Sequence, residues 1–207
     1  MKLVLATANV GKQREFAALL SPLGVQLLLS SALGIDSAAE TGATFEANAL
    51  LKARHAAGAS GLPALADDSG LEVDALDGRP GVYSARYAGA QATEADNNAR
   101  LLSELAVVPP QRRSARYRCV LALVRDAADT APLIASGSWE GRIALQPAGN
   151  GGFGYDPLFL PEGLEVSAAE LPLGRKNALS HRARALAALV KQLERSPLSE
   201  TSPGMPC

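Results

Sequence analysis

The segment Ala66-Asp67-Asp68-Ser69-Gly70 places two adjacent carboxylates between an apolar run and an alternating run of residues. Neighbouring residues of a β-strand point to opposite faces of a sheet, so a strand that continued through this segment would bury one carboxylate. Burying an unpaired carboxylate is costly. We therefore predict that a strand over residues 64–66 ends here and that a second strand covers residues 71–74. Gly70 would turn the chain so that both acids and the serine face an open cleft.

Such a pair of acids suits a divalent cation. Two carboxylates about 4 Å apart repel by about 4 kcal/mol at an effective dielectric constant of 20. A cation would reverse that penalty, and ligands made only of oxygen favour magnesium. A solvated turn that simply ends a strand is also rich in Asp, Ser and Gly. The segment alone leaves both interpretations open.

The composition is that of an ordinary globular protein, with 47% hydrophobic and 20% charged residues among 207. Its 20 basic and 21 acidic residues give a net charge of −1, so we expect neither nucleic acid nor membrane as a partner. The apolar run over residues 1–6 is too short for a signal peptide or a membrane span. Cys119 and Cys207 make no disulfide framework. We expect a cytoplasmic protein.

Helical and extended patterns alternate along the chain and predict an α/β fold with a mixed sheet. Thr44 and Thr93 are expected to cap helices over residues 45–59 and 94–105, and Ser180 to cap a last helix. Residues 196–207 are rich in Pro and Ser, which predicts a disordered tail. The remaining expected elements are a helix over residues 12–20 and strands over residues 2–6, 25–29, 117–124 and 133–145.

The segment Thr7-Ala8-Asn9-Val10-Gly11-Lys12 follows the first expected strand and opens the first expected helix. A helix N-terminus after a strand is a ready anion site, and a lysine there adds a point charge. The spacing is not that of a P-loop, which needs two glycines before Lys-Ser or Lys-Thr. Ordinary helix capping by Asn9 would explain the same residues.

Glu40 precedes the helix that begins after Thr44, and this helix places Glu46, Asn48 and Lys52 at or near one face. Glu40 could therefore donate an oxygen to the same cation as Asp68. An exposed acid in a loop is the alternative interpretation.

The glycine-rich segment over residues 149–154 has the spacing of a dinucleotide fingerprint, but no helix follows it. Residues 155–160 contain a proline and strand-type side chains instead. We predict a flexible loop that displays Phe153, Tyr155 and Asp156, with the aromatic ring of Phe153 available to stack on a nucleobase. The alternative is that Phe153 fills the core.

Basic residues gather at two further places. Arg175-Lys176 and Ser180-His181-Arg182 put cations near the start of the last helix, where they oppose the helix dipole, and this indicates a ligand with carbonyl or phosphate acceptors. The run over residues 112–118 is rich in arginine. Given the near-zero net charge, we interpret it as a solvated strand edge or a dimer contact rather than a nucleic-acid site.

Taken together, these motifs resemble the inosine triphosphate pyrophosphatase family over roughly residues 1–195. The resemblance is carried by several motifs in order: Thr7-x-Asn9-x-x-Lys12, Ala66-Asp67-Asp68-Ser69-Gly70-Leu71, Gly78-x-Pro80-Gly81-Val82-Tyr83-Ser84-Ala85-Arg86, Gly151-Gly152-Phe153-Gly154-Tyr155-Asp156-Pro157 and Ser180-His181-Arg182. The tail from Ser196 onward lies outside the pattern.

The resemblance implies a magnesium-dependent enzyme that hydrolyses deaminated purine nucleoside triphosphates to the monophosphate and pyrophosphate. It also implies a homodimer, with an elongated mixed sheet and two lobes around a nucleotide-binding cleft. Magnesium falls to Glu40 and Asp68, and Asp68 is also the expected proton acceptor. Substrate contacts are implied for Thr7, Ala8, Asn9, Val10, Gly11, Lys12, Lys52, Ser69, Phe153, Gly154, Tyr155, Asp156, Lys176, His181 and Arg182.

Two other functions compete with this one. A Maf-like nucleotide pyrophosphatase would act on pyrimidine or modified nucleotides, but the cluster at residues 180–182 and the Phe153 loop disfavour it. A non-catalytic module that binds nucleic acid through residues 112–118 would show a steep salt dependence and release no pyrophosphate.

Overall fold

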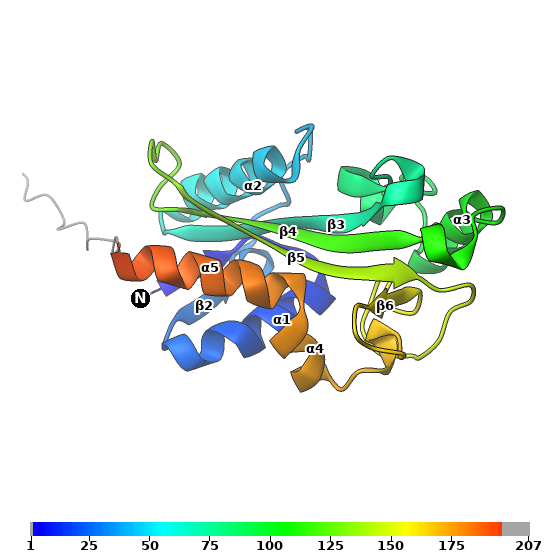
Figure 1. The fold of residues 1–207 in the computed structure, drawn as a ribbon. Helices are drawn as coiled ribbons and strands as arrows, with labels where there is room; N and C mark the ends of the chain where they lie inside the picture. Colours follow the sequence, from blue (N-terminus) through cyan, green and yellow to red (C-terminus); the bar gives the residue numbers. More distant parts are fainter. Residues whose placement is uncertain (1, 196–207) are drawn as a thin grey trace, which may run out of the picture.

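A six-stranded mixed sheet runs through the computed structural model, which describes residues 2–195 (Figure 1). The strand order is β2-β1-β3-β4-β5-β6; β1 is parallel to both β2 and β3, and the remaining pairs are antiparallel. This arrangement confirms the predicted α/β class and mixed sheet. The strands are β1 (Lys2–Leu5), β2 (Gln26–Leu29), β3 (Ala64–Val73), β4 (Ser114–Val124), β5 (Leu133–Ile143) and β6 (Phe159–Pro161).

Helices cover both faces of the sheet, with α2 on one face and α1 and α5 on the other (Figure 1). The caps expected at Thr44 and Thr93 are present, and so is the Asn9 cap that the sequence left as an alternative, since each side chain accepts a hydrogen bond from a backbone N–H of the first turn. The helices are α1 (Val10–Leu20), α2 (Phe45–Ser60), α3 (Glu94–Glu104), α4 (Leu173–Leu179) and α5 (His181–Arg195).

The apolar side chains form three clusters. Small residues of α2 such as Ala49 and Ala53 pack on one face of the sheet, and Phe16 and Leu186 pack on the other. A third cluster around Trp139 fills the far end of the long strands, next to α3 and β6. The prediction of a single two-lobed domain over residues 1–195 stays a prediction.

The predicted strand break at the acidic segment is wrong. Strand β3 continues through it, with Asp67 opposite Leu121 and Asp68 opposite Val120 on β4. Both carboxylates are buried, because cations on each face of the sheet pair with them and remove the cost that argued for a break. Gly70 lies within the strand; a Cβ there would meet the Gly81 carbonyl oxygen and the Ser84 hydroxyl.

Other expectations need correction as well. Strand β4 lies between β3 and β5, so the arginine run over residues 112–118 is not at a strand edge. Arg113 is buried and donates to the carbonyl oxygens of Leu105, Val108 and Ala144. Helix α4 was not predicted. The proposed tail over residues 196–207 lies outside the described residues, and no helix within residues 2–195 is long and apolar enough to cross a membrane.

Candidate active site

A cavity of about 390 Å³ lies beside β3 at the point where its neighbour β1 has ended. Strand β1 pairs with β3 only as far as Leu65, so the edge of β3 from Ala66 to Ser69 is not covered by β1. Most of the predicted site residues line this cavity: Thr7, Ala8, Asn9, Lys12, Glu40, Lys52, Asp68, Ser69, Phe153, Gly154, Tyr155, Asp156, His181 and Arg182. Val10, Gly11 and Lys176 do not line it.

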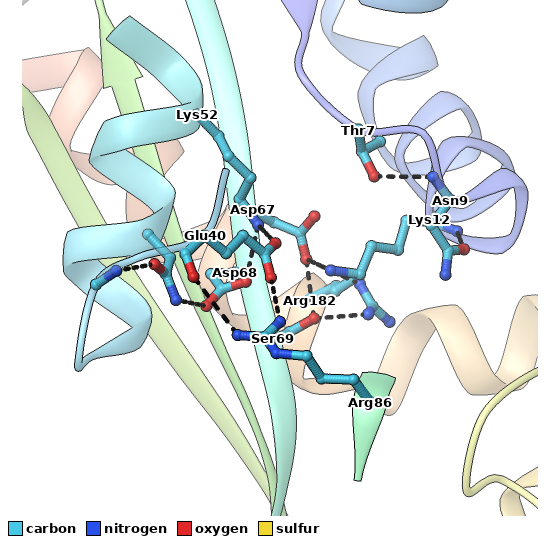
Figure 2. A network of polar contacts seen from close by, with 12 residues as sticks. Thr7, Asn9, Lys12, Glu40, Lys52, Asp67, Asp68, Ser69, Arg86 and Arg182 are labelled. Atoms are coloured by element: carbon cyan, nitrogen blue, oxygen red, sulfur yellow. Dashed lines mark hydrogen bonds and ion pairs between the residues drawn. The ribbon is translucent and has the colours of Figure 1, made fainter. Parts of the chain in front are cut away.

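One lysine joins the two predicted metal ligands. Lys52 Nζ lies 2.7 Å from Glu40 Oε1 and 2.8 Å from Asp68 Oδ1, and Figure 2 shows it between the two carboxylates. The other oxygen of Asp68 accepts a hydrogen bond from Asn48 Nδ2 at 3.2 Å. Helix α2 supplies both Asn48 and Lys52, which are four residues apart and so share one face.

Burial and charge act in opposite directions on these two carboxyls. Burial raises the pKa of Asp68 above its usual value, and the nearby Lys52 only partly offsets this effect. Burial also favours the neutral form of Glu40, but there Lys52 prevails and the pKa is lowered. Of the two carboxyls, only Asp68 has its pKa shifted upward, which is the direction that favours a proton acceptor.

Asp67 belongs to the opposite face of the sheet. It is fully buried, its Oδ2 lies 2.9 Å from Lys12 Nζ and 3.6 Å from Arg182 Nε, and the Ser69 hydroxyl donates to the same oxygen. Burial raises the pKa of Asp67, but Lys12 and Arg182 outweigh it and hold that pKa well below the usual range. The expectation that Asp67 faces an open cleft is wrong; it anchors two cations of the site.

The donor set fits magnesium in the way that phosphate-transferring enzymes use it. Glu40 and Asp68 are the two candidate carboxylate ligands, and residues 2–195 contain no cluster of three or more His, Cys, Asp or Glu side chains able to hold a metal. Magnesium is commonly held by one or two carboxylates, with water and substrate phosphates completing its shell. The pair of Glu40 and Asp68, which the Lys52 ammonium bridges in this structure, matches that requirement.

The loop before α1 shows the helix capping by Asn9 that the sequence left open, and anion binding at this loop stays a prediction. Thr7 Oγ1 accepts from the Asn9 backbone N–H at 3.2 Å, and Asn9 Oδ1 accepts from the Lys12 N–H at 2.9 Å. The Lys12 side chain continues toward Asp67 (Figure 2). A Cβ on Gly11 would collide with the ring of Phe153, so this loop packs directly against the aromatic wall of the cavity.

Phe153 lies in front of two cations. Its ring centroid is 4.8 Å from Lys176 Nζ and 5.1 Å from Arg182 Cζ. Tyr155 and Asp156 are buried rather than displayed, which corrects part of the loop prediction. Asp156 closes the loop, because its carboxylate accepts from the Phe153 N–H at 2.8 Å, the Tyr117 hydroxyl at 3.2 Å and Lys176 Nζ at 2.5 Å.

Glu15 pairs with Lys176 and Arg182, the two cations beside Phe153, and was missed by the sequence analysis. Its carboxylate accepts from Arg182 Nη1 at 2.7 Å and pairs with Lys176 Nζ at 2.8 Å. The signal was available, because Glu15 lies four residues before Leu19 and therefore on the apolar face of α1. Arg182 also donates to the Ser69 hydroxyl at 2.9 Å, which connects the wall to β3.

His181 faces the cavity without a fixed partner. Its ring stacks on Tyr117 with centroids 4.7 Å apart, and among residues 2–195 neither ring nitrogen has a hydrogen-bond partner. Burial, assisted by the positive charge of Arg182, lowers the pKa of His181 well below its usual value. The neutral imidazole offers one donor and one acceptor to a bound molecule.

The fold and the cavity define a class of protein, the α/β proteins with a mixed sheet and a cavity partly lined by charged residues beside a central strand. The start of α1, a carboxylate pair and an aromatic ring with neighbouring polar donors all face one cavity. The chain belongs to the Ham1 family, whose model matches residues 3–192. This membership confirms the resemblance seen in the sequence.

Relatives of known name agree closely. A dITP/XTP pyrophosphatase from Methylococcus capsulatus is 59% identical over 192 residues, which are 93% of this chain and 96% of that protein. The dITP/XTP pyrophosphatase of Escherichia coli K12 is 54% identical and covers 93% and 98%. A HAM1 protein structure from Coxiella burnetii is 45% identical, with a TM-score of 0.86 over 95% of this chain and 100% of that one.

Proposed function

We propose that this protein hydrolyses deaminated purine nucleoside triphosphates (dITP, ITP and XTP or dXTP) to the nucleoside monophosphate and pyrophosphate. Such an activity removes these nucleotides before they enter DNA or RNA. The observation that carries the proposal is that two groups of residues line the same cavity. One group is Asp68, Lys52 and Glu40, and the other is Phe153, His181 and Arg182. Relatives at 54–59% identity carry the name of this activity.

The phosphate end of the cavity has the charges that the reaction needs. Lys12 and Lys52 supply positive charge to a triphosphate, whose own charge repels an incoming nucleophile. Asp68 accepts a proton from the attacking water, a role supported by its raised pKa. We propose magnesium as the cofactor, held by Glu40 and Asp68; when bound, it would neutralise charge on the phosphates.

The base end supplies hydrogen-bond donors. A deaminated purine carries a keto oxygen at carbon 6, which accepts from donors such as Arg182 and His181. Adenine presents an amino group there, which cannot accept a hydrogen bond from the Arg182 guanidinium, and a mismatch of this kind can discriminate by up to ~10⁴–10⁵. Guanine shares the keto oxygen, so its exclusion has to involve its 2-amino group.

A substrate panel tests the proposal. Pyrophosphate release is measured with ITP, XTP, dATP, dGTP and UTP at equal concentrations, with and without magnesium. We expect ITP and XTP to be preferred and magnesium to be required. A preference for dATP would overturn the proposal, and a preference for UTP over ITP would favour the Maf-like alternative.

We further propose that the protein acts as a cytoplasmic homodimer. The mass in solution, measured by light scattering across a range of protein concentrations, tests the dimer. A monomeric mass throughout that range would contradict it.

A further inference from the structure

The motif over residues 78–86 contains an arginine that the proposed function leaves without a role. Arg86 ends the 3₁₀ segment η4 (Gly81–Arg86), and its guanidinium reaches Glu40. Nη1 lies 3.2 Å from Glu40 Oε2, and Nη2 lies 3.5 Å from the Glu40 carbonyl oxygen. One guanidinium thus contacts both the side chain and the backbone of a candidate metal ligand.

Glu40 has little other support for its position. It belongs to residues 34–44, which form no helix or strand. Its side chain is partly exposed, at 29%. Within the described residues, its carboxylate pairs only with Lys52, through Oε1, and with Arg86, through Oε2. Lys52 is shared with Asp68, whereas among residues 2–195 the only carboxylate that pairs with Arg86 is that of Glu40.

The segment that carries Arg86 is, by contrast, firmly anchored. The Ser84 hydroxyl accepts from the Leu71 N–H at 2.9 Å and donates to the Gly81 carbonyl oxygen at 2.6 Å. The Tyr155 hydroxyl donates to the Ser84 carbonyl oxygen at 2.9 Å. Asn97 holds the backbone on both sides of Arg86, through the Ala85 carbonyl oxygen and the Ala88 N–H.

The two oxygens of Glu40 are therefore divided between two directions. Oε1 faces Lys52 and Asp68, whereas Oε2 faces Arg86, as Figure 2 shows. Hydrogen-bonding partners of a metal ligand fix its orientation and commonly change metal affinity about 10- to 100-fold when they are removed. We infer that Arg86 is a positioning residue that holds Glu40 so that its inner oxygen, beside Asp68, is presented to a divalent cation.

Electrostatics alone would have the opposite effect. Arg86 is a cation, and removing it would make the site more negative and tighten the binding of a metal ion. The direction of the change therefore separates positioning from simple charge. This inference rests on the proposed function, because the assignment of Glu40 as a metal ligand belongs to it.

The test measures metal binding directly, in the absence of nucleotide. Mn²⁺ is titrated into the full-length protein and free Mn²⁺ is followed by electron paramagnetic resonance, for wild type, Arg86→Gln, Arg86→Lys and Glu40→Gln. We expect Arg86→Gln to bind Mn²⁺ about tenfold more weakly. The Mn²⁺ affinity of Arg86→Lys should fall between those of Arg86→Gln and wild type, because an ammonium offers a single point of contact where the guanidinium offers two. The variant Glu40→Gln/Arg86→Gln should bind no more weakly than Glu40→Gln alone.

A matched control comes from the same part of the chain. Arg79 Nη1 lies 2.8 Å from Glu104 Oε2, which is also an arginine–glutamate pair but does not line the cavity. Arg79→Gln should bind Mn²⁺ as wild type does. Far-ultraviolet circular dichroism and thermal unfolding establish that each variant is folded.

Several outcomes would overturn the inference. Unchanged or tighter Mn²⁺ binding by Arg86→Gln would do so, as would a further loss in the double variant or no binding by wild type. A kinetic readout supports the titration: the magnesium concentration for half-maximal hydrolysis of ITP should rise about tenfold in Arg86→Gln, with turnover recovered at excess magnesium. A wild-type protein that binds Mn²⁺ but releases no pyrophosphate from ITP would contradict the proposed function and leave the Arg86 titration interpretable.

Discussion

Asp67 and Asp68 are consecutive residues of β3, yet their carboxylates pair with different lysines on opposite faces of the sheet. Lys12, in the first turn of α1, lies 2.9 Å from Asp67, and Lys52, on α2, lies 2.8 Å from Asp68. Asp68 borders the cavity, whereas Asp67 is fully enclosed. The two acids are thus expected to respond differently to the same chemical change.

Replacement of Asp68 by asparagine should abolish most turnover without unfolding the protein. The substitution removes the proton acceptor, whose contribution is typically ~10²–10⁴-fold, while the new side-chain amide still offers an oxygen to Lys52. Pyrophosphate release with ITP under saturating magnesium measures the effect, and thermal unfolding checks the fold. Turnover close to that of wild type would remove Asp68 from the mechanism.

The same substitution at Asp67 should act mainly on stability. Neutralising this carboxylate leaves Lys12 and Arg182 without their shared anion, and breaking a buried ion pair costs about 3–5 kcal/mol. Urea unfolding of Asp67→Asn beside Asp68→Asn measures the difference. Equal unfolding free energies in the two variants would contradict the structural role of Asp67.

Lys12→Ala should raise the KM for triphosphates. A hydrogen bond to a charged group is worth about 1.5–3 kcal/mol, which corresponds to roughly a 10- to 100-fold change. Lys191→Ala, an exposed lysine on α5, serves as the control and should leave KM unchanged. A KM for ITP that is the same in Lys12→Ala as in wild type would argue against phosphate binding at this loop.

Phe153→Leu should weaken the binding of all purine substrates to a similar extent. Stacking of a base on an aromatic ring is worth ~1–3 kcal/mol and depends little on which base is stacked. The ratio of kcat/KM for ITP to that for dATP should therefore persist in Phe153→Leu and fall in Arg182→Gln. A ratio that collapses in Phe153→Leu would assign base selection to the ring itself.

His181 should make the protein less stable in mild acid. Its pKa in the folded protein is lowered by burial, so below the unfolded-state value of about 6.5 the unfolded chain binds more protons. Stability attributable to His181 is complete above that pH and is lost as the pH falls below it, by at most about 1.4 kcal/mol per pH unit. The Asp67 and Glu40 carboxyls, whose pKa values are lowered, have their effect at more acidic pH.

Urea unfolding of wild type and His181→Phe between pH 7 and pH 5 measures this contribution. The phenylalanine keeps an aromatic ring against Tyr117 and cannot titrate. Its unfolding free energy should change less with pH than that of wild type. Identical slopes would show that His181 does not account for the acid sensitivity.

Much of the fold and of the candidate site was predictable from local patterns. Caps at Thr44 and Thr93, and apolar periodicity, identified the principal helices. The long-range pairings were not predictable. Whether β3 breaks at Asp67 depends on Lys12 and Arg182, which are distant in the sequence and meet the strand only after folding.

The same reason explains the missed partners. Arg86 and Glu40 are 46 residues apart and belong to irregular or 3₁₀ segments, so no periodicity relates them. Lys176 was expected to contact the base, and its placement behind Phe153 follows from Glu15 and Asp156, two buried acids that both pair with it. Local sequence patterns therefore did not predict which residues of distant segments form buried ion pairs.

The uncovered edge of β3 also has an evolutionary consequence. Side chains from both faces of the sheet border the cavity around this edge, with Asp68 and its partner Lys52 on the α2 side and Arg182 on the α5 side. The strand thus separates two sets of residues, and under the proposed function one set acts on the phosphates and the other on the base. Substitutions that retune which base is accepted can accumulate on one side while the machinery that cleaves the phosphate chain is left intact.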